Sequence, residues 1–272
     1  MRYAIISIVF TGLCAGSGVL VPFLISKKKA LSKPKKILVG VFTGFILFFV
    51  GAGIYFGIRY HSDATAKKAL ESGNGVAVEE IDHGYYFDGP GEGCALIFYP
   101  GAKVEESSYA PLLRMLAENG VDCFLVGMPL NMAIFGTDRA DELTENYSYG
   151  KWFIAGHSLG GTAASNYAYK NKNKIDGVIL LASYSTKDIS DMRVLSVYGS
   201  NDLCLEKDAY EKNKTNLPSD LTEVVIEGGN HAYFGNYGEQ KGDGKADISR
   251  ETQQHKTVSF ILGFIYTTPG NK

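Results

Sequence analysis

A nine-residue stretch, Phe153-Ile-Ala-Gly-His-Ser-Leu-Gly-Gly161, constrains the fold more than any other part of the chain. It begins as an apolar run, passes through the pattern Gly-x-Ser-x-Gly, and continues into a helix-like segment from Thr162 to Ala168. This order predicts a strand, a sharp turn and a helix, with the serine raised above the end of the strand. Small residues on both sides of the turn let the two backbones approach closely. Ser158 is therefore the candidate nucleophile, although a glycine-rich turn can also hold an incidental serine.

Apolar runs alternate with amphipathic segments on both sides of this stretch. The predicted strands are Val76–Phe87 (a strand or hairpin), Cys94–Tyr99, Val121–Val126, Lys151–Ala155, Val178–Ala182, Val194–Tyr198 and Val224–Ile226. The predicted helices are Tyr109–Glu118, Asp138–Tyr147, Thr162–Lys170, Asp208–Asn213 and Ser249–Phe264. This alternation is typical of an α/β fold with a doubly wound, mostly parallel sheet and helices on both faces.

The N-terminal quarter of the chain differs, because two long apolar runs precede the alternating part. Ala4 to Ile25 and Ile37 to Ile58 each contain 22 residues, enough for a helix to cross a hydrocarbon core of about 30 Å. Between them, six lysines occur in the eleven residues from Ser26 to Lys36. A loop that is short and basic stays on the cytoplasmic side of a membrane. The sequence therefore predicts a transmembrane helical hairpin with both of its ends on the extracytoplasmic side.

These runs divide the chain into three parts. We expect the transmembrane hairpin over residues 1–60, a polar tether over residues 61–75 that can include a short helix from Ala64 to Leu70, and a catalytic domain over residues 76–272 that lies outside the cytoplasm. A cleaved signal peptide is the alternative for the first run, but Arg2 is its only basic residue before the apolar part, and that part is long for a signal sequence.

Glycines recur at four-residue spacing in both apolar runs, for example Gly12 with Gly16 and Gly40 with Gly44. This spacing lets membrane helices touch backbone to backbone, so it favours a hairpin packed on itself or a homodimer. The alternative explanation is that glycine is simply frequent in membrane helices.

Composition excludes several classes of function. The formal net charge is −2, whereas nucleic-acid binding requires a basic face. The four cysteines lack the spacing of a metal site, and Cys94 and Cys123 lie in apolar runs typical of small buried thiols. We expect no metal and no organic cofactor. The expected partners are the lipid bilayer and a small acyl substrate.

The partners of Ser158 are predicted from strand ends, because ligands bind beyond the carboxyl ends of parallel strands. Of the five histidines, His231 alone follows an apolar strand on a loop, so it is the candidate base. Asp202 follows the strand Val194–Tyr198 and is the candidate acid that orients the imidazole. Asp188 and Asp191 are the alternatives. A loop histidine and a turn aspartate can also be ordinary surface residues.

An acyl-transfer site also needs two N–H donors for the developing oxyanion. The backbone of Leu159, directly after the nucleophile, is one candidate. The other is the backbone of Ala102, on the Pro-Gly loop that follows the strand Cys94–Tyr99. Three aromatic residues near strand ends, Tyr184, Tyr233 and Phe234, are candidates for lining the substrate pocket, although such residues are as often core.

Four segments, in this order, carry a resemblance to a known family. They are Tyr99-Pro-Gly-Ala-Lys-Val104, Gly156-His-Ser-Leu-Gly-Gly161, Tyr198-Gly-Ser-Asn-Asp202 and Gly228-Gly-Asn-His-Ala-Tyr-Phe-Gly235. Over residues 76–266 the chain resembles the α/β-hydrolase superfamily, and especially the small lidless branch called alpha/beta hydrolase family 5, which is related to dienelactone hydrolases. The resemblance implies an α/β-hydrolase fold.

By this similarity, Ser158, Asp202 and His231 occupy the nucleophile, acid and base positions, and Ala102 and Leu159 the oxyanion positions. Dienelactone hydrolases carry a cysteine nucleophile, so the serine favours ordinary ester chemistry over their substrate. The resemblance therefore implies a serine hydrolase that cleaves an ester or thioester, and the apolar runs predict that it is anchored in a membrane. The alternative is a catalytically silent hydrolase fold that serves as a tethered binding or scaffold module.

Overall fold

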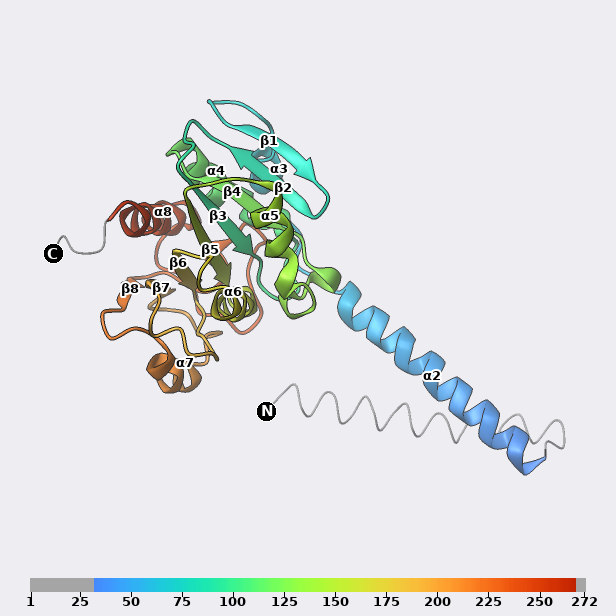
Figure 1. The fold of residues 1–272 in the computed structure, drawn as a ribbon. Helices are drawn as coiled ribbons and strands as arrows, with labels where there is room; N and C mark the ends of the chain where they lie inside the picture. Colours follow the sequence, from blue (N-terminus) through green and yellow to red (C-terminus); the bar gives the residue numbers. More distant parts are fainter. Residues whose placement is uncertain (1–31, 268–272) are drawn as a thin grey trace. The chain divides into compact units, whose positions relative to one another are not determined.

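The structure is a computed structural model in which residues 32–267 are described (Figure 1). The chain divides into two compact units, with the boundary between Ile58 and Arg59. The first expected membrane run, residues 4–25, lies outside the described residues.

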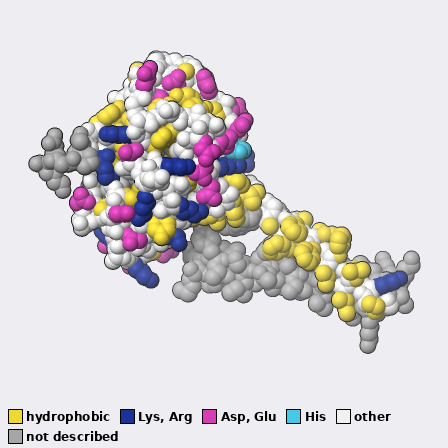
Figure 2. All heavy atoms as spheres, viewed as in Figure 1, with side chains coloured by type: hydrophobic (Ala, Val, Ile, Leu, Met, Phe, Trp, Pro, Cys, Tyr) yellow, Lys and Arg dark blue, Asp and Glu magenta, His cyan; other side chains and the backbone are white. Residues whose placement is uncertain are grey.

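The second expected membrane run is a helix, α2 (Lys33–Gly57). Its stretch from Pro34 to Gly53 is 20 residues long, and in the residues described here it is the one helix long and apolar enough to cross a bilayer. Its large apolar side chains are exposed, as the hydrophobic surface in Figure 2 shows. An apolar helix surface this long needs an apolar environment to cover it.

The second unit is built on an eight-stranded sheet in the order β1-β2-β4-β3-β5-β6-β7-β8. The strands are β1 (Ala77–Ile81), β2 (Gly84–Asp88), β3 (Cys94–Tyr99), β4 (Asp122–Val126), β5 (Lys151–His157), β6 (Gly177–Leu181), β7 (Val194–Gly199) and β8 (Thr222–Ile226). Strand β1 pairs antiparallel with β2, and β2 pairs antiparallel with β4. The neighbouring strands in the order β4-β3-β5-β6-β7-β8 pair in parallel. The doubly wound, mostly parallel sheet expected from the sequence is confirmed.

Helices cover both faces of the sheet (Figure 1). They are α3 (Ala64–Lys68), α4 (Ala110–Glu118), α5 (Ala140–Asn146), α6 (Leu159–Lys170), α7 (Lys207–Asn213) and α8 (Arg250–Tyr266). Short 3-10 turns are η1 (Glu106–Tyr109), η2 (Pro129–Asn131), η3 (Ala133–Phe135), η4 (Thr137–Arg139), η5 (Lys214–Asn216) and η6 (Ala232–Phe234).

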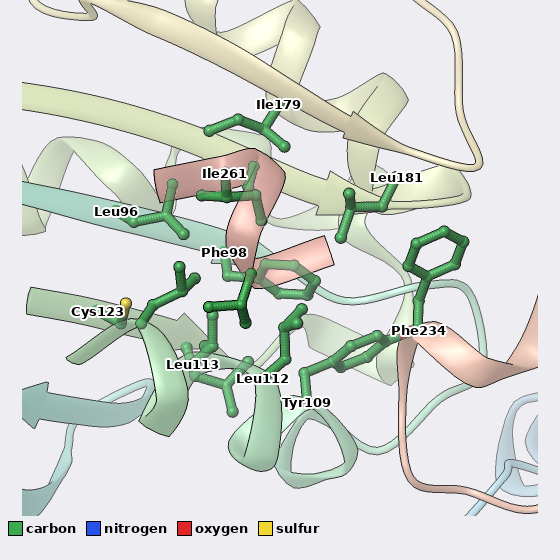
Figure 3. Close-up of a cluster of buried hydrophobic side chains, with 14 of the residues drawn as sticks. Leu96, Phe98, Tyr109, Leu112, Leu113, Cys123, Ile179, Leu181, Phe234 and Ile261 are labelled. Atoms are coloured by element: carbon green, nitrogen blue, oxygen red, sulfur yellow. The ribbon is translucent and has the colours of Figure 1, made fainter. Parts of the chain in front are cut away.

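Strand β3 shows how the sheet separates two cores, because all six of its residues are buried. Leu96 and Phe98 pack in the core beneath α4 and α8, where they meet Leu112 and Ile261 (Figure 3). The residues that alternate with them pack with Tyr167 and its neighbours on α6. Successive side chains of a strand point to opposite faces, so a continuous apolar strand indicates burial on both sides.

The segment expected to be a tether is part of the second unit instead. Asp63 caps α3 by accepting the N–H of Ala66, and the side chain of Ala66 is fully buried. Arg114 of α4 donates to the carbonyl oxygens of Ala69 and Gly73. A polar composition did not reveal this packing, because small alanines and backbone carbonyls make most of the contacts.

Candidate active site

The turn at Ser158 has the strained geometry that the motif predicts. Ser158 has φ 54° and ψ −125°, between the last residue of β5 and the first of α6. A Cβ atom added to Gly156 would lie 2.3 Å from the carbonyl carbon of Gly160, and one added to Gly161 would lie 2.6 Å from Ser183. Only glycine allows the helix to pass this close to the strand. Ser158 is partly exposed, so its hydroxyl group stands at the surface.

Asp202 and His231 come together at the same edge of the sheet, on the loops after β7 and β8. Nδ1 of His231 lies 2.9 Å from Oδ2 of Asp202, and both side chains are buried. The other carboxylate oxygen, Oδ1, accepts the backbone N–H groups of Cys204 and Leu205, both at 2.8 Å. One oxygen is thus held by the backbone while the other faces the imidazole. This arrangement can fix the ring orientation and stabilise an imidazolium.

The alternative acids lie elsewhere. Asp188 is exposed and accepts bonds from the backbone and hydroxyl of Ser190. Asp191 pairs with Lys172 at 2.5 Å on the surface. Neither carboxylate is placed beside His231, so the geometry favours Asp202 among the three candidates.

The candidate oxyanion loop packs directly on the elbow. A Cβ atom added to Gly160 would lie 2.1 Å from the carbonyl oxygen of Tyr99 and 2.4 Å from that of Pro100. This close approach brings the start of α6 against the loop that carries Ala102. Leu159 is the first residue of α6, where N–H groups lack an acceptor within the helix and the helix dipole favours negative charge. Ala102 and Leu159 are both partly exposed.

A buried hydrogen-bond chain connects this loop to the elbow through His157, the variable residue of the motif. The N–H of Gly101 donates to the hydroxyl oxygen of Tyr109 at 3.1 Å, and that hydroxyl lies 2.8 Å from Nδ1 of His157. Because the hydroxyl accepts from Gly101, its own proton is available to Nδ1 of His157. The His157 ring centroid lies 4.5 Å from that of His231. The sequence analysis assigned no role to Tyr109 or His157.

Burial changes the titration of this cluster. Loss of solvent lowers the pKa of His157 well below its usual range, and the nearby charge of His231 lowers it further. Burial also raises the pKa of the Tyr109 hydroxyl, although its bond with Gly101 opposes the shift. Both groups are therefore neutral at pH 7, so the ring beside His231 carries no charge.

Two further residues hold the acid and base loops, and only the structure reveals them. Asp243 accepts the N–H of Ala232 at 2.9 Å through Oδ2 and that of Leu203 at 3.3 Å through Oδ1, so one carboxylate bridges both loops. Gln253 of α8 accepts from the N–H of Asn230 at 3.0 Å and donates to its carbonyl oxygen at 2.8 Å. The only sequence feature that could have indicated this role of Asp243 was its position between two glycines in the turn Gly242-Asp-Gly244.

The three candidate pocket aromatics lie in different surroundings. Tyr184 is partly exposed on the segment after β6. Tyr233 donates to Glu239 at 3.1 Å, and the guanidinium of Arg250 lies 4.4 Å from its ring centroid. Phe234 is fully buried in the core beside Tyr109 (Figure 3). The structure therefore places Phe234 in the core and not on an open pocket wall, because its side chain is fully buried and its ring centroid lies 5.5 Å from that of His157.

The N-terminal end of the second unit also reaches the site. Tyr60 donates its N–H to the carbonyl oxygen of Lys103 at 2.7 Å and accepts the N–H of Glu105 at 2.9 Å. Its ring centroid lies 5.5 Å from that of Tyr237, on the segment after His231. Residues 32–267 include no group of three or more His, Cys, Asp or Glu arranged to hold a metal ion.

Solved structures share this architecture. A dienelactone hydrolase from Anabaena variabilis is 14% identical, with a TM-score of 0.54 over 70% of this chain and 98% of that one. A monoacylglycerol lipase from Paleococcus ferrophilus is 14% identical, with a TM-score of 0.53 over 70% and 99% of the two chains. A predicted CIB-like hydrolase from Thermoplasma acidophilum is 14% identical, with a TM-score of 0.52 over 70% and 100%. At this identity the likeness shows the fold alone.

Sequence comparison assigns the family. No curated protein matches the chain. A family model described as "Alpha/beta hydrolase family" matches residues 95–255, which is more than half of the 272 residues. The matched range starts in β3, includes the strained elbow, and extends through both loops into α8. The fold, the elbow and this match agree, and the chain belongs to the alpha/beta hydrolase family.

Proposed function

We propose that this protein is a serine hydrolase that cleaves an ester or thioester through an acyl-enzyme on Ser158. The observation that carries the proposal is the buried Asp202–His231 pair, with 2.9 Å between Oδ2 and Nδ1, beside an elbow that holds a partly exposed serine at φ 54°. A strained nucleophile next to an oriented base is the arrangement that activates a hydroxyl group. The names of two similar structures, a dienelactone hydrolase and a monoacylglycerol lipase, fit ester cleavage.

In the proposed reaction, the Ser158 oxygen bonds to the acyl carbon while His231 takes the hydroxyl proton. The backbone N–H groups of Ala102 and Leu159 stabilise the negative oxygen of the tetrahedral intermediate. The bond to the leaving oxygen or sulfur then breaks, and His231 gives it the proton. Water repeats the sequence on the acyl-enzyme, releasing the acid and restoring the serine. The serine proton leaves with the alcohol or thiol, and a proton from water replaces it, so these residues need no co-reactant besides water.

The proposal includes a membrane anchor. The exposed apolar surface of α2 supports a bilayer around it, and the expected hairpin and the basic loop place the catalytic unit outside the cytoplasm. Addition of an impermeant protease to intact cells tests this orientation. Cleavage of the catalytic unit without lysis is the expected result, whereas protection until lysis would contradict it.

Labelling with a fluorophosphonate probe tests the chemistry on full-length protein in detergent. We expect labelling of the wild type and none of Ser158→Ala, because the probe reacts only with an activated serine. His231→Ala should lose labelling by orders of magnitude, and turnover of a short-chain ester should fall at least about a thousandfold in both variants. A folded wild-type protein that is never labelled would refute the hydrolase and favour the silent scaffold.

A further inference from the structure

The end of strand β6 binds the backbone of Ser158 through both of its polar groups. β6 lies beside β5 in the sheet (Figure 1), and the parallel register sets His157 opposite Leu181. The N–H of Ser158 donates to the carbonyl oxygen of Leu181 at 2.9 Å. The hydroxyl of Ser183 donates to the carbonyl oxygen of Ser158 at 2.6 Å. One short segment therefore holds the N–H and the C=O of the proposed nucleophile.

The residue between these two contacts has a strained backbone. Ala182 has φ 49°, in the left-handed region that is uncommon for a residue other than glycine. It is buried, and its N–H donates to the carbonyl oxygen of Val197 on β7 at 2.8 Å. Strain of this kind persists only where the surrounding contacts fix it, and it is concentrated at functional sites. Here it turns the chain so that the Leu181 carbonyl and the Ser183 hydroxyl both reach Ser158.

The carbonyl oxygen that Ser183 binds belongs to the peptide group between Ser158 and Leu159. The N–H of this same peptide group is the proposed oxyanion donor. A peptide group is planar, and in its trans form the C=O and N–H bonds point in opposite directions. A hydrogen bond to the oxygen therefore helps to set the direction of the N–H. It also polarises the peptide group, because hydrogen bonds in a chain strengthen one another.

The contacts around Ser183 direct its proton to this one oxygen. A carbonyl oxygen has two lone pairs, and the Ser158 oxygen also accepts the N–H of Gly161 at 3.0 Å, within the first turn of α6. The hydroxyl of Thr162 lies 3.4 Å from that of Ser183, but it donates to the carbonyl oxygen of Tyr184 at 3.0 Å. Ser183 is 3% exposed, so water does not compete for its hydroxyl group.

We infer that Ser183 is a positioning residue for the cleavage reaction, because its hydroxyl orients and polarises the peptide group that presents the Leu159 N–H to the oxyanion. This inference rests on the proposed hydrolase function. When the N–H of this peptide binds the oxyanion, its carbonyl oxygen gains negative charge, and the Ser183 hydroxyl stabilises that charge. The bond is therefore stronger in the transition state than in the resting protein, and only such a difference accelerates the chemical step.

Ester hydrolysis by the full-length protein in detergent tests this role through two serine-to-alanine variants. Ser183→Ala removes the hydroxyl and keeps the Leu159 N–H. Ser165→Ala is the matched control, because Ser165 is also buried and its hydroxyl also donates to a backbone carbonyl oxygen, that of Thr162, at 2.9 Å. The peptide group that Ser165 binds lies inside α6 and not at its first residue. The control therefore loses the same kind of hydrogen bond away from the proposed oxyanion donor.

We expect Ser183→Ala to lower kcat for a short-chain ester about tenfold and to leave KM unchanged, because loss of an oxyanion donor costs about 10²–10³ in kcat and this variant keeps the donor. Ser165→Ala should match the wild type in both constants. A trifluoromethyl ketone, which forms a tetrahedral adduct with an activated serine, gives a second measurement. Ser183→Ala should weaken its binding by about the same factor as kcat, because the adduct carries the oxyanion.

Ser183→Cys keeps a side chain of the same shape but donates weakly, so its kcat should lie between those of the wild type and Ser183→Ala, and it serves if the alanine variant does not fold. Equal kcat and equal inhibitor binding in the Ser183 variants and Ser165→Ala would overturn the inference, and so would a loss in KM alone.

Fluorophosphonate labelling of the same samples separates this failure from that of the proposed function. A labelled wild type with indistinguishable variants would refute the role of Ser183 and leave the hydrolase in place. An unlabelled, folded wild type would refute the hydrolase and this inference with it.

Discussion

The loops of the proposed acid and base (the acid and base side) and the loop of the proposed oxyanion donor (the oxyanion side) meet at one edge of the sheet, but different interactions hold them there. On the acid and base side, buried polar groups do so: Asp243 bridges the two loops, and Gln253 binds both backbone groups of Asn230. A carboxylate or amide of this kind has fixed hydrogen-bond geometry and is costly to leave unpaired. This side is therefore rigid because its polar atoms are satisfied within the domain.

The oxyanion side depends on aromatic packing and on the start of the unit. Tyr109 contacts His157 at a ring distance of 5.7 Å and Tyr237 at 6.4 Å, and Tyr237 contacts Tyr60 at 5.5 Å. Its buried polar link is the chain of hydrogen bonds from Gly101 through Tyr109 to His157. The comparison teaches that the loop of the proposed base is held by side-chain hydrogen bonds, whereas the loop of the proposed oxyanion donor is held by aromatic packing and by the backbone of Tyr60 at the start of the unit.

Among changes to the residues that hold the loops, loss of the Asp243 bridge should have the largest effect. Asp243→Asn keeps the shape but replaces one acceptor oxygen with an NH2 group, which faces an N–H donor of Ala232 or Leu203. The unpaired donor costs about 1–3 kcal/mol, so we expect kcat/KM to fall about ten- to a hundredfold, with a lower melting temperature. Asp208→Asn, on the exposed surface of α7, is the control. Unchanged turnover would show that the loops need no bridge.

Removal of the Tyr109 hydroxyl should have a smaller effect, of about tenfold on kcat. Tyr109→Phe keeps the ring packing but leaves the Gly101 N–H without its acceptor, so the oxyanion loop loses its fixed position. Loss of an interaction that is made only in the transition state lowers kcat with little change in KM. Tyr210→Phe removes another buried hydroxyl, which lies 2.8 Å from Ser196, and should leave kcat unchanged. Equal kcat values for the two variants would show that the Tyr109 hydroxyl does not position the loop of the proposed oxyanion donor.

The strands of the sheet and the elbow could be predicted from the sequence because their signals are local. The run Cys94–Tyr99 is apolar throughout and is β3 with the predicted bounds. The glycines around Ser158 predicted the close approach of α6 to β5, because only small residues allow it. Asp202 and His231 were predicted to lie close together because they follow strands whose ends meet at one edge, and 2.9 Å separates Nδ1 from Oδ2 in the structure.

The supporting residues could not be predicted, because their partners are distant in the chain. Asp243 lies 40 residues from Leu203, and Tyr109 lies 48 residues from His157. Tyr60 was expected at the end of the transmembrane hairpin, since its backbone hydrogen bonds to Lys103 and Glu105 leave no side-chain pattern. Phe234 was expected on the pocket wall, because a loop aromatic shows no periodicity that reveals burial.

The smallest expected effect is a pH dependence that comes from His157 on the oxyanion side. The pKa of His157 is lowered in the folded protein by burial and by the charge of His231. The group beside its Nδ1 is the neutral hydroxyl of Tyr109. The unfolded chain, with an ordinary histidine pKa of about 6.5, therefore binds more protons than the folded one below that pH. Stability must then fall as the pH drops below about 6.5, by at most about 1.4 kcal/mol per pH unit from this group.

Urea unfolding of the full chain in detergent between pH 7.5 and 5 measures this slope. His157→Asn should reduce the slope of stability against pH by the equivalent of up to one bound proton, because asparagine does not titrate. His255→Asn, which removes a ring that is 62% exposed on α8, is the matched control. If His157→Asn and the wild type lose stability in parallel, the buried ring does not gain a proton on unfolding, and the oxyanion side would be no more sensitive to acid than the rest of the domain.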